Sequence, residues 1–324
     1  MSKGNTMKGL WLENRELKFS EDLPFPQLEE DEVLIKVHLA GICSTDLEML
    51  KGYYPFTGIP GHEFVGEVVD ANGHEAWAGK RVLGDINISC GGCERCLSLE
   101  PHHCLQRRTL GIFDYNGVFA EYCKLPVKNL TAVPDEVSDV LAVFAEPTAA
   151  AMRILDQVQI RPSHRVIVVG AGRLGLLIAQ VLKNTGCDLS VVARRPESAD
   201  LLTTMGIKAH SHDGKSTKKA DIVVDATGSP DGFELSRSLV RARGTLVLKS
   251  TFAENVSVNL SKLVVDEISL IGSRCGNYGA GLRALASGLV QIGEMVDSIY
   301  SLEDGLEAFE QAGKPGILKV LIRP

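Results

Sequence analysis

Between residues 165 and 271 the chain alternates short apolar runs with segments of high helix propensity. Residues 165–170 (R-V-I-V-V-G) are apolar and β-branched, which is typical of a strand that is buried on both faces. An apolar helix is expected over residues 174–184, and further strands and helices follow with short connections. This alternation predicts an α/β fold with a doubly wound parallel sheet, because helices that connect parallel strands cover the faces of their sheet.

The part of the chain before this alternation has a different pattern. Residues 32–39 (E-V-L-I-K-V-H-L) alternate apolar side chains with others, and residues 64–69 and 81–83 form further short apolar runs among glycine-rich turns. These features predict an antiparallel β domain with irregular loops. At about 100–200 residues per domain, a chain of 324 residues suits two domains of these two kinds.

Composition and charge exclude several classes of function. Hydrophobic residues make up 44% of the chain and charged residues 23%, which is the balance of a folded globular protein. The net charge of −7 argues against a broad surface for nucleic acid. The longest apolar runs are shorter than the ~20 residues of a membrane span, and the N-terminus has no signal-peptide core. We therefore expect a cytoplasmic protein with reduced thiols that binds neither nucleic acid nor membranes.

Four of the eight cysteines lie within fifteen residues. Their spacing is C-x2-C-x2-C-x7-C, and the residues are Cys90, Cys93, Cys96 and Cys104. Four thiolates complete the tetrahedral shell of a structural zinc ion, although an iron–sulfur cluster also uses four. Free or disulfide-linked cysteines are the alternative, and a reducing compartment disfavours it. Because a closed shell leaves no position for substrate, this zinc is expected to stabilise a loop.

A second group of metal-binding residue types is spread over three motifs. Cys43 lies in A-G-I-C-S-T-D-L-E, His62 and Glu63 lie in G-I-P-G-H-E-F-V-G-E-V-V, and Glu146 lies in F-A-E-P-T-A-A-A. One thiolate, one imidazole and one or two carboxylates can form a catalytic zinc shell with a position left for water or substrate. Each residue taken singly also has a structural interpretation, so the hypothesis depends on the combination.

A glycine-rich turn connects the first strand of the alternating region to its helix. The sequence G-A-G-R-L-G places Gly170, Gly172 and Gly175 in a G-x-G-x-x-G pattern, with Arg173 and Leu174 between the last two. In such a turn the first glycine permits the bend, the second lets a pyrophosphate approach the backbone, and the third lets helix pack on strand. The free N–H groups of the helix N-terminus would then bind the phosphates. The pattern predicts dinucleotide binding, with a purely structural βα turn as the alternative.

The end of the second strand bears on the choice of cofactor. The sequence V-V-A-R-R places Ala193, Arg194 and Arg195 where an acidic residue would accept hydrogen bonds from the adenosine ribose. A missing carboxylate and two guanidinium groups suit the 2′-phosphate of NADP. We therefore expect NADP to be preferred over NAD, with a solvated basic loop as the alternative.

Together these motifs resemble those of the zinc-dependent medium-chain alcohol dehydrogenases. G-H-E-F-V-G-E-V-V is similar to the zinc signature of that family, the cysteine spacing to its structural-zinc lobe, and G-A-G-R-L-G to its cofactor turn. The resemblance covers nearly the whole chain. It implies a GroES-like catalytic domain, residues 1–147 and 273–324, around a Rossmann domain at residues 148–272. It also implies a homodimer or homotetramer in which the strand near residues 267–271 pairs across a two-fold axis.

The resemblance also implies roles for individual residues. Cys43 and His62 match the first two ligands of the catalytic zinc. The E-P pair at Glu146 resembles the polyol, glucose and threonine dehydrogenase branch, in which the glutamate of G-H-E, here Glu63, is an alternative ligand. The choice between the two glutamates stays open. Thr45 matches the hydroxyl residue of the proton relay.

Three further positions gain an interpretation from the resemblance. Asp46 resembles a residue behind the zinc ligands, and Arg274, in I-G-S-R-C-G-N-Y, resembles a position that lines the nicotinamide or substrate pocket. Glu48 stands where many alcohol dehydrogenases have a relay histidine. The stretch between Cys104 and Glu146 is compact, which implies a short substrate-covering loop.

The expected activity is hydride transfer between a secondary alcohol, polyol or sugar and NADP or NAD, with two zinc ions per chain. The catalytic zinc would act as a Lewis acid, Thr45 would pass on the substrate proton, and hydride would move to the nicotinamide. The alternatives are a threonine-type amino-alcohol dehydrogenase, a catalytically silent NADP-binding regulator, and a zinc-stabilised nucleic-acid binder. Three cysteines have no predicted role, and these are Cys123, Cys187 and Cys275.

Overall fold

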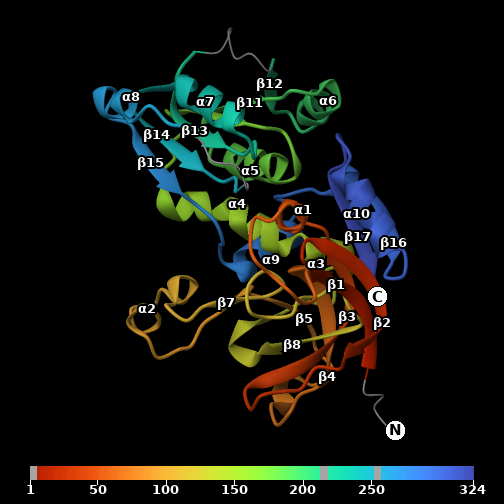
Figure 1. Ribbon diagram of the computed structural model, residues 1–324. Coiled ribbons are helices and arrows are strands. Elements are labelled where there is room, and N and C mark those ends of the chain that lie inside the picture. The colour runs from red at the N-terminus through yellow and green to blue at the C-terminus, as the bar shows by residue number, and fades with distance from the viewer. Residues whose placement is uncertain (1–5, 212–217, 252–256) are drawn as a thin grey trace. The chain divides into compact units, whose positions relative to one another are not determined.

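The computed structural model describes residues 6–211, 218–251 and 257–324 (Figure 1). The chain forms two compact units. The first comprises the described residues up to Glu146 together with Ile292–Pro324, and the second comprises the described residues of Pro147–Gln291. The second unit is therefore inserted into the first, and the chain crosses between them twice.

The second crossing falls at Ile292, whereas the resemblance places it near residue 273. Residues 273–291, which include α9 (Tyr278–Ala286), belong to the second unit because hydrogen bonds hold this segment to it. Gln180 Nε2 donates to Gln291 O (3.0 Å), and Gln291 N donates back to Gln180 Oε1 (2.8 Å). Asn184 Nδ2 donates to Leu289 O (3.4 Å). These bonds extend the second unit to Gln291.

A six-stranded parallel sheet forms the second unit. Its strand order is β12-β11-β10-β13-β14-β15, so the strand that comes first in the chain lies at the centre, where the order reverses. The strands are β10 (Arg165–Val169), β11 (Asp188–Val192), β12 (Lys208–His210), β13 (Ala220–Asp225), β14 (Val240–Leu248) and β15 (Ser269–Gly272). The other helices are α4 (Ala145–Gln157), which begins before the crossing, α5 (Arg173–Lys183), α6 (Pro196–Thr204), α7 (Pro230–Leu239) and α8 (Leu260–Val265). The predicted doubly wound fold is confirmed.

The core of this unit follows from the apolar sequence of β10 and α5. Residues 166–169 are almost completely buried, and residues 175–182 of α5 are all buried. Only residues 170–172 separate the end of β10 from the start of α5, so this glycine turn is held on both sides by packed elements. The carboxyl ends of the parallel strands lie on the same edge of the sheet as this turn.

The first unit is built on a seven-stranded sheet. Its order is β16-β17-β3-β4-β5-β9, and β8 pairs with β3. β16 and β17 run parallel, and the other pairs of this sheet are antiparallel. The strands are β3 (Glu32–Gly41), β4 (Glu63–Asp70), β5 (Arg81–Gly84), β8 (Tyr122–Pro126), β9 (Leu130–Ala132), β16 (Val296–Ser301) and β17 (Lys319–Arg323). The predicted antiparallel β domain is confirmed.

Smaller elements complete the first unit. β1 (Thr6–Glu13) pairs with β2 (Glu16–Pro24) through a two-residue turn in which Asn14 and Arg15 both have positive φ. The sequence did not predict this hairpin, because an arginine in place of glycine removes the usual turn signal. A second short pair is β6 (Asn87–Ile88) with β7 (Arg108–Thr109). The helices are α1 (Ser44–Leu50), α2 (Glu94–Leu97), α3 (Asp139–Val143) and α10 (Gly305–Gly313), with 3₁₀ turns η1 (Glu75–Trp77), η2 (Pro101–His103), η3 (Val127–Asn129) and η4 (Gly293–Met295).

Across residues 6–211, 218–251 and 257–324, no helix has both the length and the apolar character that crossing a bilayer requires.

Candidate metal centres and cofactor turn

Three potential metal ligands from two segments of the first unit meet at the end of β3 and the start of β4. Cys43, His62 and Glu63 each offer one donor atom, and these atoms lie within 4.8 Å of one another. Gly41, the last residue of β3, lies opposite Glu63, the first residue of β4. The antiparallel register therefore brings the residues that follow β3 beside those that precede β4.

Asp46 holds two of these three residues in place. Its Oδ2 accepts a hydrogen bond from Cys43 N (2.8 Å), which fixes the start of α1, and its Oδ1 lies 3.3 Å from His62 Nδ1. Burial opposes a positive charge on His62, but the Asp46 carboxylate and the neighbouring Cys43 outweigh it and raise the pKa of His62 well above 6.5. Because Asp46 faces Nδ1, the other ring nitrogen, Nε2, is left for a metal ion.

The donor set of this site fits zinc. A thiolate, an imidazole and a carboxylate are three protein ligands, and a catalytic zinc site leaves its fourth position for water or substrate. The buried atoms Asp46 Oδ1 and His62 Nδ1 lie 3.3 Å apart but make no hydrogen bond, and a metal ion on Nε2 would fix the imidazole so that Nδ1 could donate to this carboxylate. Thr45 Oγ1 lies 3.8 Å from Cys43 Sγ and places a hydroxyl next to the thiolate.

Glu146, the fourth residue that the sequence predicts as a ligand of the catalytic zinc, is not in the group formed by Cys43, His62 and Glu63. Glu146 is the second residue of α4 and is half-buried, and the described group within 4.8 Å contains Glu63 as its only carboxylate. Glu48, at the position of the family's relay histidine, accepts a hydrogen bond from Lys51 Nζ (2.7 Å).

The four clustered cysteines lie close together in the first unit. They belong to residues 90–104, the segment around α2 that we call the α2 lobe. Their ligand atoms lie within 4.8 Å of one another, and none of the described cysteines forms a disulfide. Cys93 Sγ is 3.5 Å from Cys96 Sγ and 3.8 Å from Cys104 Sγ. Four thiolates at the usual Zn–S distance of about 2.3 Å from a tetrahedral centre are separated by about 3.8 Å. The sulfur spacing therefore fits a closed zinc shell.

Backbone N–H groups stabilise negative charge in this cluster. Hydrogen bonds from the N–H groups of Cys96 and Leu105 lower the pKa of the Cys93 thiol to about 6. Cys90 N and Gln106 N each donate to Cys104 Sγ at 3.3 Å. Burial, together with the nearby Cys93, raises the pKa of Cys96 to about 11. The thiolate of Cys93 thus forms easily while Cys96 resists ionisation, and a divalent cation bound by both would remove that resistance.

At each of the three glycines of the cofactor turn, a Cβ atom would have a different surrounding. Gly170 has φ +104°, and a Cβ there would lie 2.7 Å from Ala226 O. A Cβ on Gly175 would overlap Gly170 O, so the helix could not pack this closely with a larger residue. A Cβ on Gly172 would meet no atom within 4 Å, so this side of the turn is open to a ligand. Arg173 and Leu174 are the first residues of α5.

Two arginines follow the second strand of the parallel sheet. Ala193 is buried at the end of β11, Arg194 is exposed, and Arg195 precedes α6. Within the described ranges neither guanidinium makes a hydrogen bond or an ion pair. Both groups are therefore available to an anion.

Arg274 follows β15 at the carboxyl edge of the same sheet and is exposed. Its carbonyl oxygen accepts a hydrogen bond from Lys249 Nζ (2.7 Å), which also donates to Ser273 Oγ (3.2 Å). Lys249 is buried directly after β14. This lysine fixes the backbone at Arg274.

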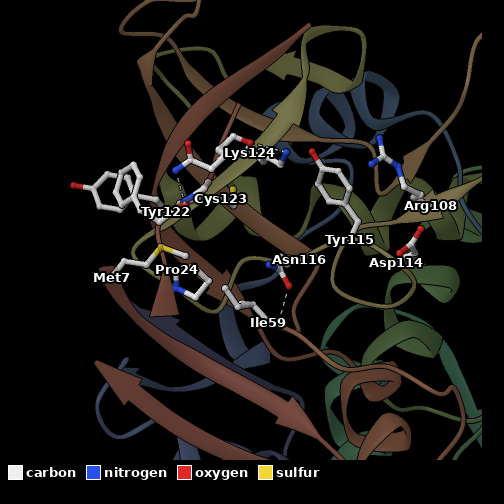
Figure 2. Close-up of a pocket in the computed structure, with 14 residues that line it drawn as sticks. Met7, Pro24, Ile59, Arg108, Asp114, Tyr115, Asn116, Tyr122, Cys123 and Lys124 are labelled. Carbon is white, nitrogen blue, oxygen red and sulfur yellow. Dashed lines mark hydrogen bonds between the residues drawn. The ribbon is translucent and has the colours of Figure 1, made fainter. Parts of the chain in front are cut away.

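A cavity of about 350 Å³ lies in the first unit (Figure 2). Its lining includes Met7, Ile59, Arg108, Tyr115, Tyr122 and Lys124. None of the candidate metal ligands or cofactor residues lines it, so it is distinct from the chemistry described above. Cys123 lines this cavity, and burial raises the pKa of its thiol, which keeps that thiol neutral.

The sequence analysis did not identify two buried lysines at strand ends. Lys249 directly follows β14, and Lys319 begins β17. Lys319 donates a hydrogen bond to Glu63 Oε2. The available signal was a single charge in the apolar run L-K-V-L-I at residues 318–322, most of which forms β17. A charged residue in such a run needs a partner, but the sequence does not say which one.

Comparison with known proteins agrees with this arrangement. The family model "Alcohol dehydrogenase GroES-like domain" matches residues 29–135, and the model "Zinc-binding dehydrogenase" matches residues 174–289. D-arabinitol dehydrogenase 1 of Uromyces fabae is 30% identical over 328 residues, which cover 92% of each chain.

Two solved structures share the fold over nearly the whole chain. One is a protein of Sinorhizobium meliloti 1021 described as a candidate zinc-binding dehydrogenase and bound to NADP, with TM-score 0.88, 26% identity, and coverage of 99% of this chain and 100% of the other. The other is an alcohol dehydrogenase of Escherichia coli CFT073 in complex with NADH, with TM-score 0.88, 27% identity and the same coverage.

A parallel dinucleotide-type sheet inserted into a metal-binding β unit defines a zinc-dependent dehydrogenase. The chain belongs to the zinc-dependent medium-chain dehydrogenase family, in the alcohol dehydrogenase superfamily.

Proposed function

We propose that the protein oxidises a secondary alcohol group of a polyol or sugar, and reduces the corresponding carbonyl, with NADP or NAD as the hydride partner. The observation that carries this proposal is the convergence of Cys43, His62 and Glu63 with Asp46 behind them. The polyol substrate class is supported by the relative from Uromyces fabae, which is named for D-arabinitol.

Residues of the first unit would have three separate roles at the catalytic metal: binding it, orienting one of its ligands, and transferring the substrate proton. Cys43, His62 and Glu63 would hold a catalytic zinc, and Glu63 would take this role in preference to Glu146 because its carboxylate lies with the other two donors. When bound, zinc supplies Lewis acidity that lowers the pKa of the substrate hydroxyl, and the nicotinamide supplies the hydride acceptor. Asp46 orients the imidazole of His62. The hydroxyl of Thr45, beside Cys43 Sγ, would accept the substrate proton and pass its own proton on toward the cofactor ribose and solvent.

A second, structural zinc ion would be held by the four cysteines of the α2 lobe, which leave no open position. Both clusters require reduced thiols, which favours a reducing compartment such as the cytoplasm. In the second unit, Gly170, Gly172 and Gly175 would shape the site for the pyrophosphate, with Arg173 and Leu174 at the start of the helix. Arg274 would contribute from the carboxyl edge of the sheet.

A substrate screen tests this function. The zinc-loaded protein is incubated with sugar alcohols, sugars, simple secondary alcohols and threonine, each with NADP and with NAD, and the absorbance of the reduced nicotinamide is recorded. We expect turnover with at least one polyol or sugar. Turnover restricted to threonine would replace the substrate class, and no turnover with any compound would favour a cofactor-binding regulator.

We propose that NADP is preferred because Arg194 and Arg195 follow β11 and neither guanidinium has a partner in the part of the chain that the structure describes. Replacing both arginines by aspartate should lower the ratio of kcat/KM for NADP to that for NAD by about tenfold or more, since hydrogen bonds to a charged group contribute about 1.5–3 kcal/mol. Arg161→Asp is the matched control, because Arg161 is an exposed arginine of the same unit at the amino end of β10. An unchanged ratio in the double variant would contradict the assignment.

We propose a homodimer or homotetramer assembled through the β15 edge of the parallel sheet. β15 is the last strand in the sheet order, and large apolar side chains are exposed on it and on the preceding α8, namely Leu260, Val264, Val265 and Leu270. An unpaired strand edge beside exposed apolar groups favours association with a second copy. Light scattering of the purified protein should give the mass of two or four chains, and a monomer would contradict this.

A further inference from the structure

We propose that Lys319 is a positioning residue of the candidate zinc site. Lys319 holds the Glu63 carboxylate so that one of its oxygens lies beside the donor atoms of Cys43 and His62. Lys319 Nζ donates a hydrogen bond to Glu63 Oε2. The inference rests on the proposed zinc-dependent function, and it adds a residue from the far end of the chain to the site.

The main chain and the side chain of Lys319 are both held. Its backbone N donates to Asp297 Oδ2 (2.9 Å), which anchors the start of β17. Its side chain is 3% exposed, and Nζ also donates to Ile42 O (3.4 Å) and lies 5.4 Å from the centre of the Phe144 ring. A lysine with so little freedom presents its ammonium group at one place, which is the carboxylate of Glu63.

Glu63 is confined from the opposite side as well. Its side chain is 1% exposed, and a Cβ on Gly41 would lie only 2.8 Å from Glu63 Oε2 and 2.9 Å from a methyl group of Val143. The carboxylate thus lies against the β3 backbone, in a space that a larger residue at Gly41 would occupy. With Gly41 behind it and Lys319 on Oε2, Glu63 has few alternative orientations.

Charge gives a second reason for this arrangement. A buried carboxylate is unfavourable without a partner, and the site already contains the Cys43 thiol and the Asp46 carboxylate as sources of negative charge. Lys319 supplies the positive charge that lets Glu63 stay in place whether or not the metal is bound. A partner that orients a metal ligand from behind typically affects metal affinity or activity by 10–100-fold when it is removed.

The first unit contains a matched control pair at the other end of β3. Lys124 Nζ lies 2.6 Å from Glu32 Oε2, and Tyr115 Oη donates to Glu32 Oε1 (2.5 Å). Figure 2 shows Lys124 and Tyr115 beside the cavity. Glu32 begins β3 and Gly41 ends it, so the two lysine–glutamate pairs are separated by about 30 Å at ~3.3 Å per residue. Both pairs are buried at the glutamate, but among the described residues Glu32 belongs to no group of three or more candidate metal ligands.

The test compares Lys319→Met with Lys124→Met in the full-length, metal-loaded protein. Zinc release to a chelator is followed for the two zinc ions, and cobalt is substituted at the catalytic site so that its visible absorption reports the ligand geometry. We expect Lys319→Met to speed the release of one zinc ion by 10–100-fold and to change the cobalt spectrum, and we expect Lys319→Arg to restore most of both. Lys124→Met should leave both readouts native.

Native zinc release and a native cobalt spectrum in Lys319→Met would overturn the proposal, even if this variant melts at a lower temperature. Lys319→Gln, which keeps a shorter hydrogen-bond donor, provides the same readouts if the methionine variant does not fold. Neither readout needs turnover, so a wrong substrate class would leave the result interpretable. If Cys43→Ala retains both zinc ions, the proposed site itself fails, and that result is distinct from a failure at Lys319.

Discussion

Replacing Cys43 by alanine should lower kcat/KM for the best alcohol substrate by about 10³-fold or more and remove one of two zinc ions per chain. The magnitude follows because a Lewis-acid metal contributes several kcal/mol to the barrier, and about 1.4 kcal/mol corresponds to tenfold in rate. Cys43 is one of three donors within 4.8 Å, so the remaining His62 and Glu63 form an incomplete shell. Zinc content by atomic emission and steady-state kinetics measure the two effects.

Cys123→Ala is the control for this variant. Cys123 is a buried cysteine of the same unit, and it lies outside the group of metal ligands. Truncating its thiol removes packing, so a small loss of stability is expected with native zinc content and turnover. Retention of full activity in Cys43→Ala would exclude a catalytic zinc at this position.

The features that could be predicted from the sequence are those that depend on residues close together in the chain. The strand at β10, the glycine turn and α5 are neighbours in the chain, so their spacing carries both the fold and the steric need for Gly170 and Gly175. The four-cysteine lobe is local in the same sense. Its ligands lie within fifteen residues, and their spacing alone indicates a metal.

The contacts that were missed depend on pairing between distant strands. Lys319 meets Glu63, 256 residues away, because β17 pairs with the end of β3, opposite the start of β4. No periodicity within either segment specifies that pairing. For the same reason the sequence left Glu63 and Glu146 as equal alternatives, whereas the register of β3 and β4 brings Glu63 to Cys43. The end of the second unit likewise depends on the long-range bonds between Gln180 and Gln291.

Replacing Cys93 by serine should unfold the α2 lobe locally and remove the structural zinc, while the catalytic zinc is retained. The lobe has almost no apolar core of its own, because its leucines point to solvent: Leu97 is 72% exposed, Leu99 90% and Leu105 68%. Its fold must therefore depend on the sulfur cluster, in which Cys93 Sγ is the atom 3.5 Å from Cys96 and 3.8 Å from Cys104. Structural zinc contributes about 10–16 kcal/mol in small zinc domains, so its loss exceeds what such a lobe can compensate.

Limited proteolysis and hydrogen exchange of residues 90–104 measure this effect, because local unfolding exposes the backbone there before the rest of the chain opens. We expect rapid cleavage in the lobe and one remaining zinc ion per chain, with the parallel sheet of the second unit still protected. Cys187→Ser is the control, since Cys187 is a half-buried thiol of the second unit without metal-binding neighbours among the described residues. A lobe that stays resistant to protease after losing its zinc would show that backbone and side-chain packing alone hold it, and the cluster would then need a role other than stabilisation.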